Sequence, residues 1–308
     1  MSQDRPVLGI LFMLGFCVLA PMGDAMAKLL GDTMAVAELA YLRFLFQMII
    51  LLPIALLTGV SLHVSRMVLS LIALRTVFHI LGLSFMFLSL RYLPLAEAVA
   101  IAFVMPFIML LLGKYVLHEE IGPRRFFGCV VGFIGTMLVV QPSFVEVGAP
   151  ALLPLGVAVF FALFMLVTRS IAKQVDPIGM QTLSGGIAVV ILFPVLLWTD
   201  LSVSPVRTDL PGFDLTLIFM MGILGTVAHL FMTWSLRYAP SATLAPMQYL
   251  EIPIATLIGW LVFKDFPNGL AALGILITMT AGLYIIFREH AVQRQNATSL
   301  QKAHHEAK

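Results

Sequence analysis

The chain has 308 residues, of which 60% are apolar and 11% are charged, and its net charge is +2. Soluble domains carry about 25% charged residues, so this composition excludes a soluble globular protein and indicates that lipid is the solvent for most of the surface. The charge is spread along the chain, and Cys17 and Cys129 lie in separate apolar stretches without the spacing of a metal site. We therefore expect no nucleic-acid partner, metal or cofactor.

Apolar runs bounded by charges, prolines or glycines predict an all-α integral membrane protein with ten transmembrane helices. A span needs about 20 apolar residues, so the chain has room for ten spans with short connections. In chain order the predicted spans are Val7–Leu29, Ala35–Leu57, Met67–Leu90, Leu95–Leu117, Phe126–Val140, Leu152–Ile171, Gly179–Trp198, Leu215–Leu236, Ala242–Phe263 and Leu270–Phe287. The polar tail at 288–308 is predicted to be a disordered cytoplasmic extension.

Lysine and arginine in the loops predict the orientation. Counted over the predicted loops, these residues are concentrated on the side of the membrane that holds the N-terminus. Both termini are therefore predicted to be cytoplasmic, and the protein is expected in a bacterial inner membrane, as a monomer or a homodimer.

An internal repeat is the strongest organisational signal. The segment Arg91-Tyr92-Leu93-Pro94 recurs as Arg237-Tyr238-Ala239-Pro240, and the same spacing matches Gly113 with Gly259 and Gly128 with Gly274. Five helices per half is an odd number, so the second half must enter the membrane from the opposite side. The sequence thus predicts two inverted five-helix repeats, 7–140 and 152–287, with a substrate site between them, as in many secondary transporters.

The same segments resemble the drug/metabolite transporter superfamily, specifically its EamA-type ten-helix members. The resemblance covers nearly the whole chain, and its motifs are fairly specific because they occur in this order twice. The residues that carry it are Leu42-Arg43-Phe44, the run from Arg91 to Ala98, Pro106, Glu119-Glu120, Gly128 to Gly135, Gln141-Pro142, Arg237-Tyr238-Ala239-Pro240, Pro253 and Lys264-Asp265. The resemblance implies a carrier with a central cavity that opens alternately to either side. The stretch from Met22 to Lys28 is most similar to the branch of riboflavin and S-adenosylmethionine uptake carriers.

Ionisable residues inside the first-half spans are candidates for substrate binding or coupling, because burying them in a membrane is costly. Asp24 and Lys28 share a face of the first helix, either as a pair near the interface or as a gate or substrate contact. Arg43 can hold a carboxylate or phosphate in a bidentate fork, or clamp two helices through backbone carbonyls. Arg75 and His79 share a face of the third helix, where His79 is either a coupling group that titrates near neutral pH or a satisfied buried histidine.

Glu97 opens the fourth predicted helix. Its carboxylate can neutralise Arg75 or Arg91, which would lower the cost of burying both members of the pair. We therefore include Glu97 among the candidate residues.

In the second half, Gln248, Tyr249 and Glu251 form a polar stretch in the ninth predicted helix. Glu251 is the carboxylate that we favour for substrate or proton binding, and the alternative is an ion pair with Arg75 or another helix. His229 and Trp234 can complete an aromatic and polar pocket for a planar ligand, although Trp234 can instead be an interface anchor.

Pro106 and Pro253 lie inside the fourth and ninth predicted helices, one position out of register in the repeat. A proline inside a helix leaves a backbone carbonyl without its donor, which is tolerated in membranes where other groups satisfy it. Both prolines are therefore predicted to bend the helices that line the cavity.

Three classes of function compete. No Gly-rich Lys-Ser/Thr phosphate loop is present, so the chain itself cannot use nucleotide hydrolysis, which favours a secondary transporter over a pump driven by ATP. A membrane-embedded enzyme acting on lipid-linked groups would need clustered acidic or histidine residues, whereas here they are scattered. A small multidrug pump that works as a dimer is disfavoured because this chain already holds both halves. The sequence therefore predicts transport of a small polar or planar metabolite, with uptake of a vitamin-like molecule such as riboflavin as the first choice and export of amino acids as the alternative.

Overall fold

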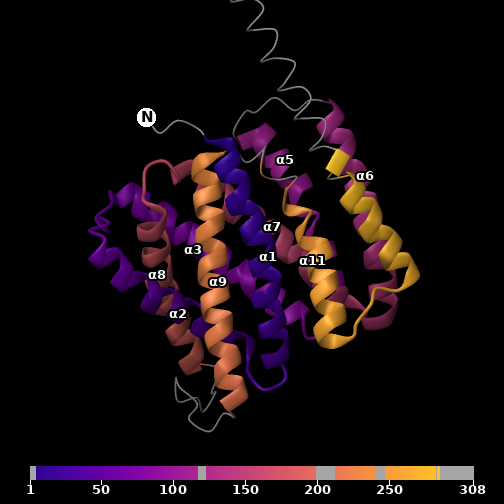
Figure 1. The fold of residues 1–308 in the computed structure, drawn as a ribbon, viewed down its shortest axis with the longest axis horizontal. Helices are drawn as coiled ribbons and strands as arrows, with labels where there is room; N and C mark the ends of the chain where they lie inside the picture. The colour runs from indigo at the N-terminus through magenta and orange to yellow at the C-terminus, as the bar shows by residue number, and fades with distance from the viewer. Residues whose placement is uncertain are drawn as a thin grey trace, which may run out of the picture.

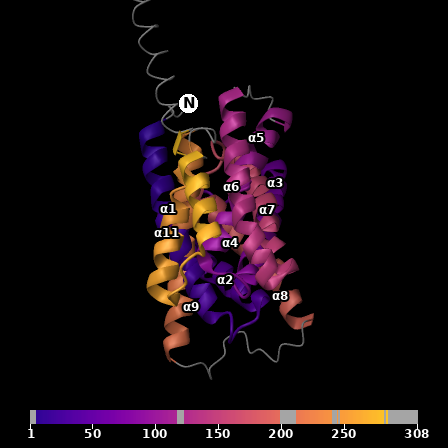
Figure 2. The same cartoon turned by 90° about the vertical axis from the view of Figure 1, so that its right-hand side faces the viewer.

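The computed structural model describes residues 5–116, 123–198, 212–239, 244, 247–281 and 283–284. Regular structure in these residues is helical throughout, and the helices run side by side along the molecule (Figures 1 and 2). In chain order they are α1 (Pro6–Leu30), α2 (Val36–Leu57), α3 (Arg66–Ser89), α4 (Leu95–Ala102), α5 (Met105–Val116), α6 (Pro123–Val147), the short 3₁₀ helix η1 (Ala149–Leu152), α7 (Leu153–Ile171), α8 (Pro177–Trp198), α9 (Gly212–Tyr238), α11 (Glu251–Ile258), the π-helical turn η2 (Gly259–Phe263) and a helix over Gly269–Ala281.

Within these ranges, seven helices are long and apolar enough to cross a membrane. They are Val7–Leu30, Val36–Leu57, Arg66–Ser89, Val130–Val147, Ala149–Ile171, Pro177–Trp198 and Gly212–Tyr238. The protein is thus a multi-pass, all-helical membrane protein, as its composition predicts. Two shorter apolar helices, Glu251–Phe263 and Gly269–Ala281, lie where the ninth and tenth spans are predicted, and the total of ten spans stays a prediction. The tail at 288–308 lies outside the described residues.

The fourth predicted span is not one continuous helix. A turn at Phe103 and Val104 separates α4 from α5. Pro106 has no backbone N–H, so a continuous helix would leave the carbonyl of Ala102 without its donor. In the second half, Tyr249 and Leu250 form a turn directly before α11, and Phe103 and Tyr249 are related by the same spacing as Arg91 and Arg237. The bending roles of the prolines themselves stay a prediction.

The fifth predicted span is also longer than expected. Its helix, α6, runs from Pro123 to Val147 and continues through Pro142, beyond the predicted end of the span at Val140. Prolines are tolerated inside membrane helices because neighbouring groups can satisfy the freed carbonyl, so this proline is a poor marker of a helix end.

Helix pairing joins the two halves of the chain. The closest pairs are α1 with α9, α3 with α7, and α2 with α8, and Figure 1 shows α1 and α9 lying alongside each other. At Gly15 on α1 an added Cβ would lie 2.5 Å from the Phe231 ring of α9, and at Gly156 on α7 it would lie 2.7 Å from the Phe85 ring of α3. Glycine therefore lets an aromatic ring pack directly on the backbone in both pairs.

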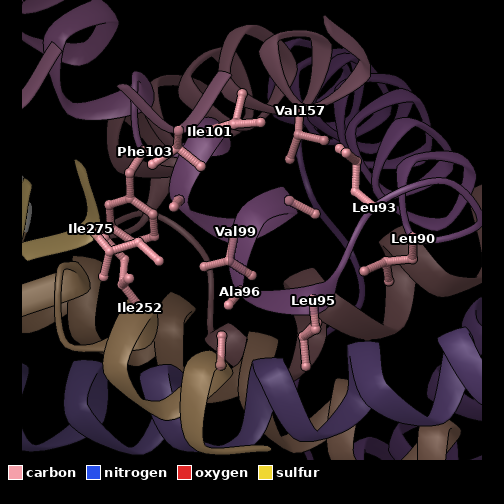
Figure 3. Packing of buried hydrophobic residues seen from close by; sticks show 14 of the residues in the cluster. Leu90, Leu93, Leu95, Ala96, Val99, Ile101, Phe103, Val157, Ile252 and Ile275 are labelled. Atoms are coloured by element: carbon pink, nitrogen blue, oxygen red, sulfur yellow. The ribbon is translucent and has the colours of Figure 1, made fainter. Parts of the chain in front are cut away.

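The short helix α4 lies in the middle of the bundle (Figure 2). Its residues Leu95, Ala96, Val99 and Ile101 are buried, in one apolar cluster with residues of both halves. Figure 3 shows this packing, in which the side chains of α4 and the turn after it face those of other helices, including Ile252. A helix of eight residues that is enclosed in this way is held by packing and places the turn at Phe103 in the interior.

Candidate substrate-binding site

A cavity of about 780 Å³, part of it open to the surroundings, lies between the two halves of the chain. Its walls come from α1, α2, α3, α4, α5, α7, α9 and α11, and they include both helix breaks, at Phe103 and before Glu251. Of the residues predicted for the site, Asp24, Arg43, His229, Gln248 and Glu251 line it.

Four phenylalanines make the cavity aromatic on several sides. They are Phe16 of α1, Phe87 of α3, Phe103 in the turn after α4, and Phe161 of α7. Aromatic faces stack on planar rings and attract cations. The cavity therefore has the surface that a planar solute with polar substituents requires.

Arg43 lies at the edge of the cavity and is held by a polar network that reaches α8 and α9. Its Nη1 donates to Oε1 of Gln47 at 3.1 Å, and the Nε2 of Gln47 donates to the backbone oxygen (2.7 Å) and Oε1 (3.0 Å) of Gln181. Gln181 in turn donates to Oγ1 of Thr233 at 2.7 Å. The network fixes the guanidinium and ties three helices together. Sequence reasoning missed both glutamines, although glutamine inside an apolar span is a visible signal.

His229 faces Arg43 across the α2–α9 contact. Its Nδ1 lies 3.0 Å from Nη2 of Arg43 and 3.0 Å from the carbonyl oxygen of Gly225. Arginine can only donate and the carbonyl oxygen can only accept, so the two contacts require opposite tautomers of the ring and compete for Nδ1. Nε2 has no hydrogen-bond partner among the described residues.

Arg75 and His79 lie behind this wall and do not line the cavity. Arg75 donates through Nε to Oγ1 of Thr168 at 2.9 Å and through Nη1 to Oγ of Ser184 at 2.6 Å. The ring of His79 lies against that of His229, with centroids 4.3 Å apart and planes inclined by 31°. The structure thus brings together residues of α2, α3 and α9 that the sequence could list but not place.

Two carboxylates also line the cavity. Asp24 comes from α1 and Glu251 from the first residue of α11. Among the described residues neither belongs to an ion pair shorter than 4 Å. The cavity therefore presents acidic groups, the base Arg43 and aromatic rings within one space.

The other predicted residues lie elsewhere. Lys28 turns away from Asp24 and binds the carbonyl oxygen of Leu93 at 2.8 Å and Oδ2 of Asp265 at 3.5 Å. Glu97 accepts a 2.6 Å hydrogen bond from Ser143 and pairs with neither Arg75 nor Arg91.

Two aromatic candidates also lie outside the cavity lining. Tyr249 packs on Phe103 in the apolar cluster around α4. Trp234 packs with Phe12 and Phe231 on the α1–α9 contact. Neither side chain therefore lines the cavity, although Tyr249 packs on a ring, Phe103, that does.

Basic side chains at both ends of the bundle bind backbone carbonyls in matching ways. Lys28, in the last turn of α1, binds the carbonyl of Leu93, and Arg169, in the last turn of α7, binds that of Ala239 at 3.1 Å. The spacing from Leu93 to Ala239 is the one that relates Arg91 to Arg237. We call the contacts of Lys28 with Leu93 and of Arg169 with Ala239 the two latches.

Comparisons with known proteins show which transporters the chain is similar to. The model of the EamA-like transporter family matches the chain twice, over residues 7–141 and 149–288. An S-adenosylmethionine uptake transporter of Rickettsia prowazekii (strain Madrid E) is 27% identical over 282 residues, which are 91% of this chain and 93% of that protein. A riboflavin transporter of Rhizobium johnstonii (strain DSM 114642 / LMG 32736 / 3841) is 29% identical over 231 residues, 72% of each chain. One solved crystal structure shares the fold, with a TM-score of 0.66 at 20% identity, covering 91% of this chain and 96% of the other.

Proposed function

Since the chain belongs to the EamA-like transporter family, we propose that it imports a small, planar, polar metabolite through the cavity by alternating access. The family and the named relatives are transporters and not enzymes. The two kinds of solute named for relatives, S-adenosylmethionine and riboflavin, are both planar in part and polar, and they are the candidates for this chain. Export of an amino acid is the alternative.

The observation that carries this proposal is the lining of the cavity. Four phenylalanine rings, two carboxylates and Arg43 surround one space of about 780 Å³ between the two halves. Aromatic walls with a few polar groups are the usual lining of sites for small planar molecules. In a membrane, ionisable residues that face such a space mark a substrate path.

Alternating access is supported by contacts that recur in the two halves. We propose that residues 7–140 and 152–287 form two inverted repeats that rock about the cavity. The ring of Phe231 on Gly15 has its counterpart in Phe85 on Gly156, and the latch of Lys28 has its counterpart in that of Arg169. Each latch closes one end of the bundle, and opening one at a time would expose the cavity to one side of the membrane.

The setting that this function requires is the bacterial inner membrane with both termini in the cytoplasm. The named relatives are bacterial, and the distribution of lysine and arginine favours this orientation. A monomer holds both halves of the cavity, so transport does not need a second copy.

Transport by the purified full-length protein in liposomes tests the proposal. Uptake of labelled S-adenosylmethionine and of riboflavin should be measured side by side, with recovery of the solute unchanged. Glu251→Gln should lower uptake because Glu251 lines the cavity, whereas Glu146→Gln, an exposed glutamate of α6, should leave uptake unchanged. Protein-dependent movement of neither solute would overturn the proposed import of these metabolites, and faster loss than gain of a preloaded amino acid would favour the exporter.

A further inference from the structure

We infer that the carboxylate of the transported solute binds at Arg43 and His229, with Arg75 and His79 directly behind them as part of the same set of side chains. This set is called the cationic cluster below. The inference rests on the proposed function, because it assigns one end of the solute to one wall of the same cavity. It also narrows the solute to a molecule that bears both a carboxylate and a positive charge.

The cationic cluster is deeply buried. Arg43, Arg75, His79 and His229 are 2%, 0%, 0% and 6% exposed. Two arginine charges in the interior of a membrane protein are costly unless opposite charge compensates them. Within the part of the chain that the structure describes, no carboxylate lies within 4 Å of either guanidinium.

Four nitrogen atoms of the cluster have no hydrogen-bond partner among the described residues. They are Nη2 of Arg75, both ring nitrogens of His79, and Nε2 of His229. Buried polar atoms are nearly always satisfied, so a group of orphaned atoms needs an explanation. Nη2 of Arg75 can donate a hydrogen bond, and so can one ring nitrogen of a neutral His79, which is what an anion requires.

These atoms belong to side chains that are linked to one another directly or through one aromatic ring. His79 is one helical turn after Arg75 on α3, and both lie against the ring of Phe164, each 4.6 Å from its centroid. His79 stacks on His229, which Arg43 contacts. The cluster is therefore one site and not four separate buried groups.

The cavity leads to the cluster. Arg43 and His229 line the cavity, as does Phe161, whose ring centroid is 5.8 Å from that of His79. A carboxylate at this wall would meet the Arg43–His229 pair first, with His79 and Arg75 behind it. Carboxylates bind arginine through charge-assisted hydrogen bonds, which are stronger than neutral ones.

The remaining charges of the cavity complete the assignment. Asp24 and Glu251 line the same space, and among the described residues neither forms an ion pair within 4 Å. A solute with a positive centre near these carboxylates and its own carboxylate at the cluster would match both. S-adenosylmethionine has this pattern, because it joins a sulfonium to an amino acid, whereas riboflavin has neither charge.

The test compares two solutes that differ in the carboxylate alone. Initial uptake of labelled S-adenosylmethionine and of its decarboxylated analogue, which keeps the sulfonium, is measured in proteoliposomes at low concentration. We expect the carboxylate to raise the uptake rate by at least about tenfold, the scale of a hydrogen bond to a charged group. Equal uptake of the two solutes would overturn the inference while leaving the proposed function intact.

Variants of the cluster test whether its side chains cause the preference for the solute that bears the carboxylate. His79→Phe keeps an aromatic ring among the phenylalanines around it, and Arg75→Gln keeps a donor. Both should lower uptake of S-adenosylmethionine to the level of the decarboxylated analogue and leave the analogue unchanged. Arg237→Gln, a basic residue paired with Asp176 outside the cluster, should preserve the discrimination. If the cluster variants lose uptake of both solutes to the same extent, the cluster has a structural role and the inference is overturned.

Two further arms separate the other outcomes. Replacing chloride by isethionate, which has no carboxylate, should not alter uptake, and an equal chloride requirement for both solutes would assign the cluster to an inorganic anion and overturn the inference. Binding is also measured in detergent by the rise in melting temperature, because a ligand stabilises the state that it binds. Preferential stabilisation by the carboxylate-bearing solute without uptake would support the site and contradict the proposed transport.

Discussion

Gly225→Ala is the substitution that most directly tests how Arg43 is held. A Cβ at Gly225 would meet Nε of Arg43 in a severe overlap, and it would lie 2.5 Å from Cζ and 2.8 Å from Cδ. Arg43 would have to leave its position and lose its hydrogen bonds to Gln47 (3.1 Å) and His229 (3.0 Å).

The expected loss of stability can be worked out from these contacts. Bonds of a charged donor contribute about 1.5–3 kcal/mol each, and overpacking of a core costs about 1–3 kcal/mol. Because the guanidinium can make partly compensating contacts after it moves, we expect the free energy of unfolding to fall by about 3 kcal/mol. We also expect uptake to be lost, since Arg43 lines the cavity.

The assay is a double-mutant cycle on the purified protein in detergent. In an Arg43→Ala background the added methyl group meets no guanidinium, so Gly225→Ala should cost less than about 0.5 kcal/mol there. Gly186→Ala is the matched control, because its Cβ would lie 3.9 Å from the Sδ of Met48, and it should be neutral or slightly stabilising. The reasoning would be refuted by an equal cost of Gly225→Ala with and without the arginine.

Three further predictions follow from contacts of the two halves. Lys28→Gln should raise hydrogen–deuterium exchange at the α3–α4 junction, and Arg169→Gln should raise it at the C-terminal end of α9. Neither variant should change the exchange at the other end of the bundle. If exchange rises at both ends in either variant, the two latches are not independent. Trp234→Ala should lower the free energy of unfolding by about 1–2 kcal/mol through lost aromatic packing. The KM of uptake should not change, because Trp234 does not line the cavity. An altered KM would indicate that Trp234 contacts the solute. Gly15→Ala and Gly156→Ala should each cost about 1–3 kcal/mol in melting experiments, since each Cβ would overlap a phenylalanine ring, and a harmless result at one of them would argue against equivalent helix pairs.

Most of the helices could be predicted because lipid imposes a simple rule on the sequence. A membrane helix must be apolar for about 20 residues, and the predicted start of the seventh span at Gly179 differs from the observed start at Pro177 by two residues. The rule fails where the backbone, and not the composition, determines where a helix ends. The break after α4 lies in a stretch whose apolar composition continues on both sides of it, so the composition does not mark it.

The site could be predicted only in part, because a residue list carries no helix rotation. Asp24 and Lys28 share a helix face in the sequence pattern, yet Asp24 lines the cavity while Lys28 reaches Leu93 and Asp265. A long side chain near a helix end can turn towards whichever partner tertiary packing supplies. Glu97 likewise finds a hydroxyl, Ser143, on another helix.

The two helix breaks explain why the cavity lies where it does. A continuous helix satisfies its own backbone hydrogen bonds and exposes only side chains. Two continuous apolar helices at the centre of the bundle would therefore pack against each other and leave no cavity. At Phe103 and before Glu251 the helix is interrupted instead, and both interruptions border the cavity. Irregular backbone at membrane depth persists only where protein or a polar cavity can satisfy it. The interruptions and the cavity therefore require each other, which is why the polar residues Gln248 and Glu251 accompany the second break.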